Sequence, residues 1–219
     1  MTKNRRLIAV FIVAACSSVM SAAAISGLFN TGVDAAGNAL VGANVSDPHW
    51  IIISGPGPNI YPTNAVTYNC CYFADTAVSR WDSVNANGSN AGSGSYTFEL
   101  TFSLAGLDPT SASITGRFAA DNHITATKMN GTTLAGDTTD TFGSYTSFSI
   151  PVGSNFFAGT NKLDFVVLDD GAPMALRVDQ LAGTANPAGT GVPEPATWAL
   201  LAGGLAALGL KSRLRKKAA

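Results

Sequence analysis

The stretch Tyr96-Thr97-Phe98-Glu99-Leu100-Thr101-Phe102-Ser103-Leu104 alternates apolar and polar side chains without a fault. Successive side chains of a β-strand point to opposite faces, so a period of two predicts a strand with one face in a core. No window between the two ends of the chain has a comparable helical period. The class of this protein is therefore expected to be all-β.

Shorter stretches of the same kind predict further strands at residues 49–54, 66–73, 114–120, 124–129, 147–150, 162–168 and 175–181. Asn130-Gly131 is a two-residue hairpin signal, because both residue types tolerate a positive φ. Leu107-Asp108-Pro109-Thr110 has the composition of a turn between strands. About eight short strands separated by turns predict a single jelly-roll-like β-sandwich, placed here at residues 25–182.

Segments rich in Gly, Pro, Asn and Ser interrupt this pattern. Residues 55–59 and 85–95 are expected to be long surface loops, and residues 183–191 a flexible linker.

The N-terminal end has the three parts of a secretory signal peptide. Lys3, Arg5 and Arg6 form a positive region, residues 7–15 are apolar, and residues 21–24 are small. This predicts a signal peptide at residues 1–24, removed by signal peptidase. Val13-Ala14-Ala15-Cys16 is an alternative, since it resembles a lipobox that would make Cys16 a lipidated N-terminus.

The C-terminal end also has three parts. Val192-Pro193-Glu194-Pro195 precedes an uncharged apolar stretch at 196–210, and a basic tail at 211–217 follows. At 1.5 Å per residue the apolar stretch is about 22 Å long, short for a transmembrane helix unless the bilayer thins around it. The charges of the tail predict its cytoplasmic side, and Trp198 belongs at the opposite interface. The charged residues of this tail are Lys211, Arg213, Arg215, Lys216 and Lys217.

In this order the Pro-Glu-Pro triplet, the short helix and the basic tail closely resemble the PEP-CTERM sorting signal, here residues 192–219. The resemblance implies transient retention in the inner membrane, processing by exosortase, and release to the cell surface or extracellular matrix. A plain C-terminal anchor that is never cut is the alternative.

Removing both ends changes the net charge. Three of the 13 basic residues lie in the N-terminal region and five in the tail, which leaves five basic against 13 acidic residues at 25–192 and a net charge of −8. Such a charge disfavours nucleic acid as a partner and favours solubility.

Motifs across the body resemble galactose-binding-like jelly rolls found in PEP-CTERM proteins. The stretches that carry this resemblance are 29–34, 47–50, 96–104, 116–122, 161–167 and 176–178. It implies a β-sandwich fold and does not name a ligand.

Cys70 and Cys71 are adjacent and cannot connect distant strands. They could form a vicinal disulfide, link two chains, or remain two small hydrophobic residues. Within a strand at 66–73 the two side chains should face opposite sides.

Candidate catalytic residues are few. His49 and His123 are the two histidines of the chain, and no nucleophile-elbow motif accompanies them. The expected function is therefore non-enzymatic.

Two kinds of ligand-binding residue remain. Asp169 and Asp170 follow an apolar strand, where carboxylates in a turn suit calcium, although a solvated turn that ends the strand is the simpler explanation. Trp50, Tyr61, Tyr72 and Trp81 could stack on a sugar or belong to the core, and Trp81, near a predicted loop, is the first choice for an exposed platform.

These features predict a non-enzymatic exported surface or matrix protein, sorted by the PEP-CTERM route and associated with exopolysaccharide. The alternatives are a carbohydrate-binding module and a secreted enzyme with an unrecognised site.

Overall fold

Strand β5 (Gly94–Ser103) lies between β10 (Thr160–Asp169) and β2 (Ser46–Ser54). It pairs with β10 along its whole length, from Gly94 opposite Asp169 to Ser103 opposite Thr160. Its alternating apolar residues are at most 3% exposed and enter the main core, as the period of two predicts. They are Tyr96, Phe98, Leu100 and Phe102.

The computed structural model describes residues 21–57, 60–86, 92–135, 142–189 and 204. The other elements in this part of the chain are β1 (Ala23–Ala24), β3 (Thr63–Thr67), β4 (Asp82–Ser83), the 3₁₀ turn η1 (Pro109–Ser111), β6 (Ser113–Asp121), β7 (His123–Met129), β8 (Thr132–Ala135), β9 (Thr146–Ile150) and β11 (Ala175–Ala185). The strands form one sheet in the order β8-β7-β10-β5-β2-β3-β4-β11-β6-β9, with β1 beside β11.

The short strands β3 and β4 join the two halves of this sheet, β8-β7-β10-β5-β2 and β11-β6-β9. Side chains from the two halves meet in one core: the rings of Phe118 in β6 and Phe165 in β10 lie 5.5 Å apart, and Trp50 in β2 lies 5.9 Å from Phe165. The prediction of an all-β sandwich is confirmed.

Two local turn predictions are also confirmed. Asn130 and Gly131 have φ values of 50° and 79° and join β7 to β8, where Met129 faces Thr132. Asp108 caps the turn η1, and its side chain accepts a hydrogen bond from the backbone N–H of Thr110.

The predicted strand at 66–73 is wrong over most of its length. β3 ends at Thr67, and the chain leaves the sheet before Cys70 and Cys71, which are joined by a disulfide. The two side chains therefore do not face opposite sides of a strand, and both are exposed.

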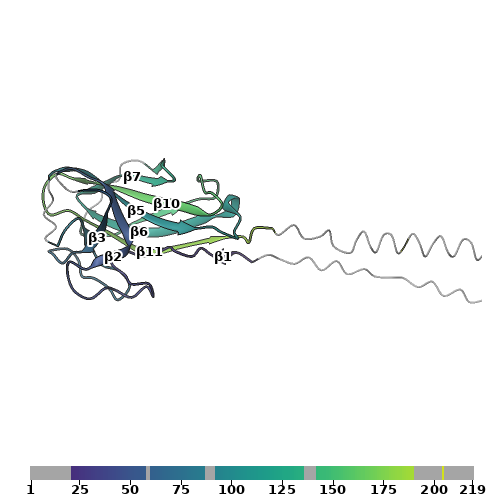
Figure 1. The fold of residues 1–219 in the computed structure, drawn as a ribbon, viewed down its shortest axis with the longest axis horizontal. Helices are drawn as coiled ribbons and strands as arrows, with labels where there is room; N and C mark the ends of the chain where they lie inside the picture. The colour runs from purple at the N-terminus through teal and green to yellow at the C-terminus, as the bar shows by residue number, and fades with distance from the viewer. Residues whose placement is uncertain (1–20, 58–59, 87–91, 136–141, 190–203, 205–219) are drawn as a thin grey trace, which may run out of the picture.

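The predicted linker begins too early. β11 continues to Ala185, where it pairs with Ala23, and Pro187 forms a bridge to Leu107. Residues 183–187 therefore belong to the folded domain, and β1 and the end of β11 lie side by side at one end of it (Figure 1).

Most of the two predicted terminal segments lies outside the described residues. Residues 1–20 of the signal peptide, and all of the sorting segment except Gly204, belong to that part. Within the described residues, no helix is long and apolar enough to cross a membrane.

Candidate functional site

The segment from Tyr68 to Trp81 crosses the outer face of β6 and β11 and builds the candidate site. Its two ends meet, because the N–H of Tyr68 donates to the carbonyl of Trp81 at 2.8 Å. Arg177 of β11, fully buried, holds the middle by donating to the carbonyl of Ala74 at 2.8 Å and to that of Ser79 at 3.1 Å. The sheet face and an irregular segment thus enclose a second, smaller cluster of apolar side chains.

Aromatic rings fill this cluster. Tyr72 lies 4.4 Å from Trp81 between ring centroids, and Phe73 lies 5.1 Å from Trp81 and 4.8 Å from Tyr145. Tyr68 packs edge-on to Tyr72 at 6.0 Å. Because centroids at 4.5–7 Å in tilted or edge-on arrangements are favourable, the rings hold one another in place.

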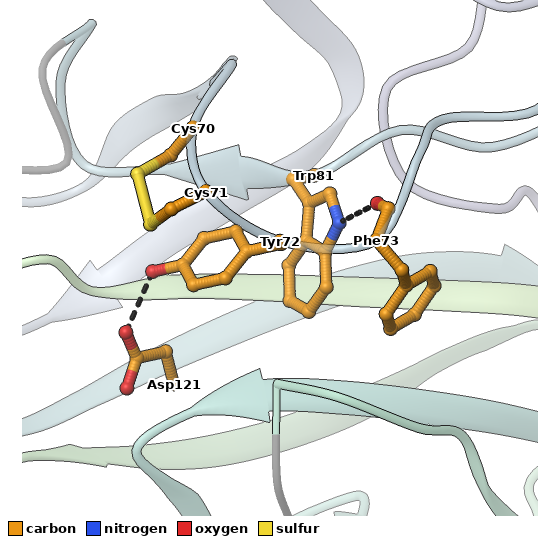
Figure 2. The surroundings of a disulfide bond; sticks show 6 residues. All are labelled: Cys70, Cys71, Tyr72, Phe73, Trp81 and Asp121. Atoms are coloured by element: carbon orange, nitrogen blue, oxygen red, sulfur yellow. Dashed lines mark hydrogen bonds between the residues drawn. A yellow bond between two sulfur atoms is a disulfide. The ribbon is translucent and has the colours of Figure 1, made fainter.

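Trp81 is 2% exposed, so the prediction that it forms an exposed platform is wrong. Its indole N–H donates to the carbonyl of Phe73 at 3.1 Å, which satisfies the polar atom of a buried ring (Figure 2). Tyr72 and Phe73 lie nearer the surface and are half-buried. Tyr145 is half-buried as well, so a ligand could reach part of all three rings.

The disulfide between Cys70 and Cys71 lies at the edge of the aromatic cluster, directly before Tyr72. Figure 2 shows the phenol of Tyr72 reaching past it to Asp121 at the end of β6, where the hydroxyl donates to Oδ2 at 2.7 Å. Burial, followed by the hydrogen bond to Asp121, raises the pKa of Tyr72, so the phenol stays protonated. The contact therefore ties the disulfide segment to the sheet.

A pocket of about 210 Å³ opens in this segment. The negative charge in its wall belongs to Asp75 and is neutralised within the protein. The carboxylate of Asp75 lies 2.8 Å from Nε of Arg80 and 4.0 Å from Nη1 of Arg177. Aromatic walls with amide and hydroxyl groups suit a neutral ligand that is apolar on one face and polar at its edge. The lining residues are Tyr68, Asn69, Cys70, Tyr72, Phe73, Ala74, Asp75 and Trp81.

A larger pocket of about 280 Å³ lies where β9 faces β7 and β8 and reaches Phe118 and Phe148 of the core. It is a gap between the two ends of the folded sheet, and none of the described residues that line it is titratable.

The two calcium candidates predicted from the sequence lie in different environments. Asp169 is fully buried at the end of β10, whereas Asp170 is exposed. The structure instead places Asp169 near Asp121, the last residue of β6. Burial raises the pKa of both carboxyls, and the charge of Asp169 raises that of Asp121 further. In the described part of the chain, no three His, Cys, Asp or Glu side chains form a metal-binding group.

The predicted sorting residues belong to the part of the chain outside the described residues. They are Val192, Pro193, Glu194, Pro195, Trp198, Lys211, Arg213, Arg215, Lys216 and Lys217.

Several solved structures are similar to this chain. The Stig cyclase Fisc from Fischerella sp. TAU is 17% identical, with 77% of this chain and 100% of the cyclase covered and a TM-score of 0.46. TmCBM61, solved with beta-1,4-galactotriose, is 13% identical, with 77% and 90% covered and a TM-score of 0.32. The CBM36-1 domain of a xylanase from the hindgut metagenome of Trinervitermes trinervoides is 14% identical, with 44% and 75% covered and a TM-score of 0.29. These values are too low to carry a conclusion about what this chain binds or catalyses.

No curated protein sequence matches the chain. A family model described as the PEP-CTERM protein-sorting motif matches residues 191–216. This match contains the Pro-Glu-Pro triplet, the apolar stretch and nearly all of the basic tail, in the order from which the resemblance was drawn. The chain therefore carries a PEP-CTERM protein-sorting motif at its C-terminal end.

Proposed function

We propose that this protein is a non-enzymatic component of the cell surface or extracellular matrix that associates with exopolysaccharide. The sorting motif at residues 191–216 carries the proposal, because it implies export and sorting by exosortase. Two properties of the body support it: the net charge of −8 at residues 25–192 derived above from five basic and 13 acidic residues, which favours solubility, and the all-β fold.

Replacing Pro193, Glu194 and Pro195 together by alanine is expected to stop processing. The altered chain should accumulate in the membrane fraction, because exosortase no longer recognises it while the apolar stretch still inserts. Fractionation followed by mass spectrometry of the C-terminus measures the result. Gly189→Ala with Thr190→Ala, just before the motif, is the control and should be released normally. Equal release of both proteins with the same C-terminus would show that the triplet does not direct sorting.

A carbohydrate-binding module is the second candidate function, favoured by the pocket between Tyr68 and Trp81. A half-buried ring such as Tyr72 can stack on the apolar face of a sugar, while neighbouring amide and hydroxyl groups bond its edge. A single stacking contact supports only modest affinity, roughly micromolar to millimolar.

Tyr72→Ala is expected to weaken binding of the host's exopolysaccharide about threefold to tenfold, the value of one aromatic contact. Isothermal titration with the full-length chain in detergent measures the change. Phe157→Ala is the matched control, since Phe157 is 51% exposed and lies next to the other end of β10. Binding that survives Tyr72→Ala unchanged in a folded protein would exclude this pocket. A wild type that binds no polysaccharide would exclude the module and the association with exopolysaccharide together.

A further inference from the structure

The ends of β6 and β10 bring two acidic side chains together at the end of the domain opposite its termini. Asp121 is the last residue of β6 and Asp169 the last of β10. Asn122 joins them, because its N–H donates to the carbonyl of Leu168 at 3.0 Å and its side-chain oxygen accepts from the N–H of Asp170 at 2.7 Å. The residue after Asp121 is thus bonded to both neighbours of Asp169.

Both carboxylates are removed from solvent, and one has an oxygen without a partner. Asp169 is 0% exposed, and its Oδ1 accepts from the N–H of Gly171 at 2.9 Å, whereas its Oδ2 has no hydrogen-bond partner in the described part of the chain. Asp121 is 5% exposed and accepts the phenol of Tyr72. A buried carboxylate normally requires an ion pair, a metal ion or a full set of hydrogen bonds.

The other buried acidic pairs of the described chain have a positive charge nearby. Glu99, which faces Asp164 across β5 and β10, lies 3.0 Å from Nζ of Lys162. Asp47 and Asp82 both accept a hydrogen bond from the N–H of Gly32. The positive charge of Arg80 lowers the pKa of Asp82, against the larger rise that burial causes.

Neither Asp121 nor Asp169 forms an ion pair in the part of the chain that the structure describes. The pair therefore differs from the other two in having no positive partner among the described residues.

We infer that Asp121 and Asp169 together bind a divalent cation, and that calcium is the ion of choice. The donors are carboxylate oxygens, which hard cations prefer, and the nearby Cys70 and Cys71 sulfur atoms are held in a disulfide. Two carboxylates fill only part of the coordination sphere of calcium, so water or backbone oxygens complete it. Such a site belongs with weak extracellular calcium modules, at dissociation constants of about 10⁻⁴–10⁻³ M.

Binding of an ion here does not require a bound polysaccharide. The proposed pair is Asp169 with Asp121, in place of Asp169 with Asp170 as expected from the sequence. Through the hydrogen bond between Tyr72 and Asp121, the ion would also hold the disulfide segment in place. Binding of calcium should therefore stabilise the fold, because a ligand that prefers the native state shifts unfolding by mass action.

The test is thermal unfolding of the full-length chain in detergent, with calcium chloride added after treatment with EDTA. The melting temperature is expected to rise with calcium, with half of the effect at about 0.1–1 mM. Asp169→Asn should abolish that rise, and in EDTA it should melt above the wild type because an uncompensated charge is gone. Asp164→Asn, which removes a buried carboxyl of the Glu99 pair, is the matched control and should keep the full response to calcium.

Direct binding separates the site from a general effect of salt. Terbium, which occupies calcium sites, should luminesce on excitation of the adjacent Tyr72 and Trp81, and calcium should displace it. If Asp169→Asn does not fold, Asp121→Asn gives the same comparison. The inference is overturned if the wild type neither shifts its melting temperature nor binds terbium at calcium or terbium up to about 10 mM, tenfold above the weak end of the expected range. It is also overturned if the folded Asp169→Asn or Asp121→Asn variant binds the ion as tightly as the wild type.

Discussion

Leu100→Asp is expected to lower the free energy of unfolding by more than about 4 kcal/mol and to leave much of the chain unfolded at 37 °C. Leu100 is 1% exposed, at the middle of β5, between Trp50 of β2 and Leu163 of β10. A carboxylate there has no cation or hydrogen-bond donor from the surrounding apolar core, so it must stay uncompensated or take up a proton. Thermal melting followed by circular dichroism measures the loss.

Thr101→Asp, one residue along the same strand, is the matched control. Thr101 is exposed on the opposite face and faces Lys162 across the strand pair, where a carboxylate gains a partner. Its unfolding free energy should change by less than about 0.5 kcal/mol. Similar losses in both variants would mean that β5 is buried on both faces and that the sandwich is described wrongly.

Arg177→Met is expected to cost about 3–5 kcal/mol, the range for removing one partner from a buried charged network. The Arg177 side chain is fully buried, and its guanidinium donates to the carbonyls of Ala74 and Ser79 and to the hydroxyl of Thr76. It also lies 5.1 Å from the ring centroid of Phe73. Methionine fills most of the volume but leaves those oxygens without a donor, so the segment from Tyr68 to Trp81 should detach from the sheet before the rest unfolds.

Arg177→Lys distinguishes geometry from charge. Lysine keeps the positive charge but has three donors on a compact ammonium rather than a planar fork. The unfolding free energy of this variant should therefore fall between those of the wild type and Arg177→Met. Chemical denaturation gives the free energies, and near-ultraviolet circular dichroism of the Tyr72 and Trp81 rings reports on the segment itself. A methionine variant as stable as the wild type, with an unchanged aromatic spectrum, would show that the segment is held by its apolar contacts alone.

Local patterns in the sequence determine the strands, the hairpin and the sorting motif. Tyr96 to Leu104 predicts a strand with one buried face, and Asn130-Gly131 predicts the hairpin turn between β7 and β8. Both are predictable because each depends on the geometry of a few consecutive residues. The sorting motif is likewise a contiguous pattern of charge and hydropathy, and the family model that matches residues 191–216 confirms it. The exception is the strand predicted at 66–73. β3 ends at Thr67, and the chain beyond it is held outside the sheet by hydrogen bonds from Arg177 and to Trp81.

The tertiary structure alone decides which side chains meet. From the sequence, Trp81 is predicted to be an exposed platform for a sugar. Its ring is buried instead, because it packs against Phe73 and the face of β6 and β11 beneath it. Tyr72 and Asp121 are 49 residues apart in the chain and hydrogen-bonded in the fold. Asp121 and Asp169 come together only because two strands from different parts of the sequence end at the same place. A period of two places a residue on a face of its own strand; which strand lies opposite follows from how the whole sheet closes around its core.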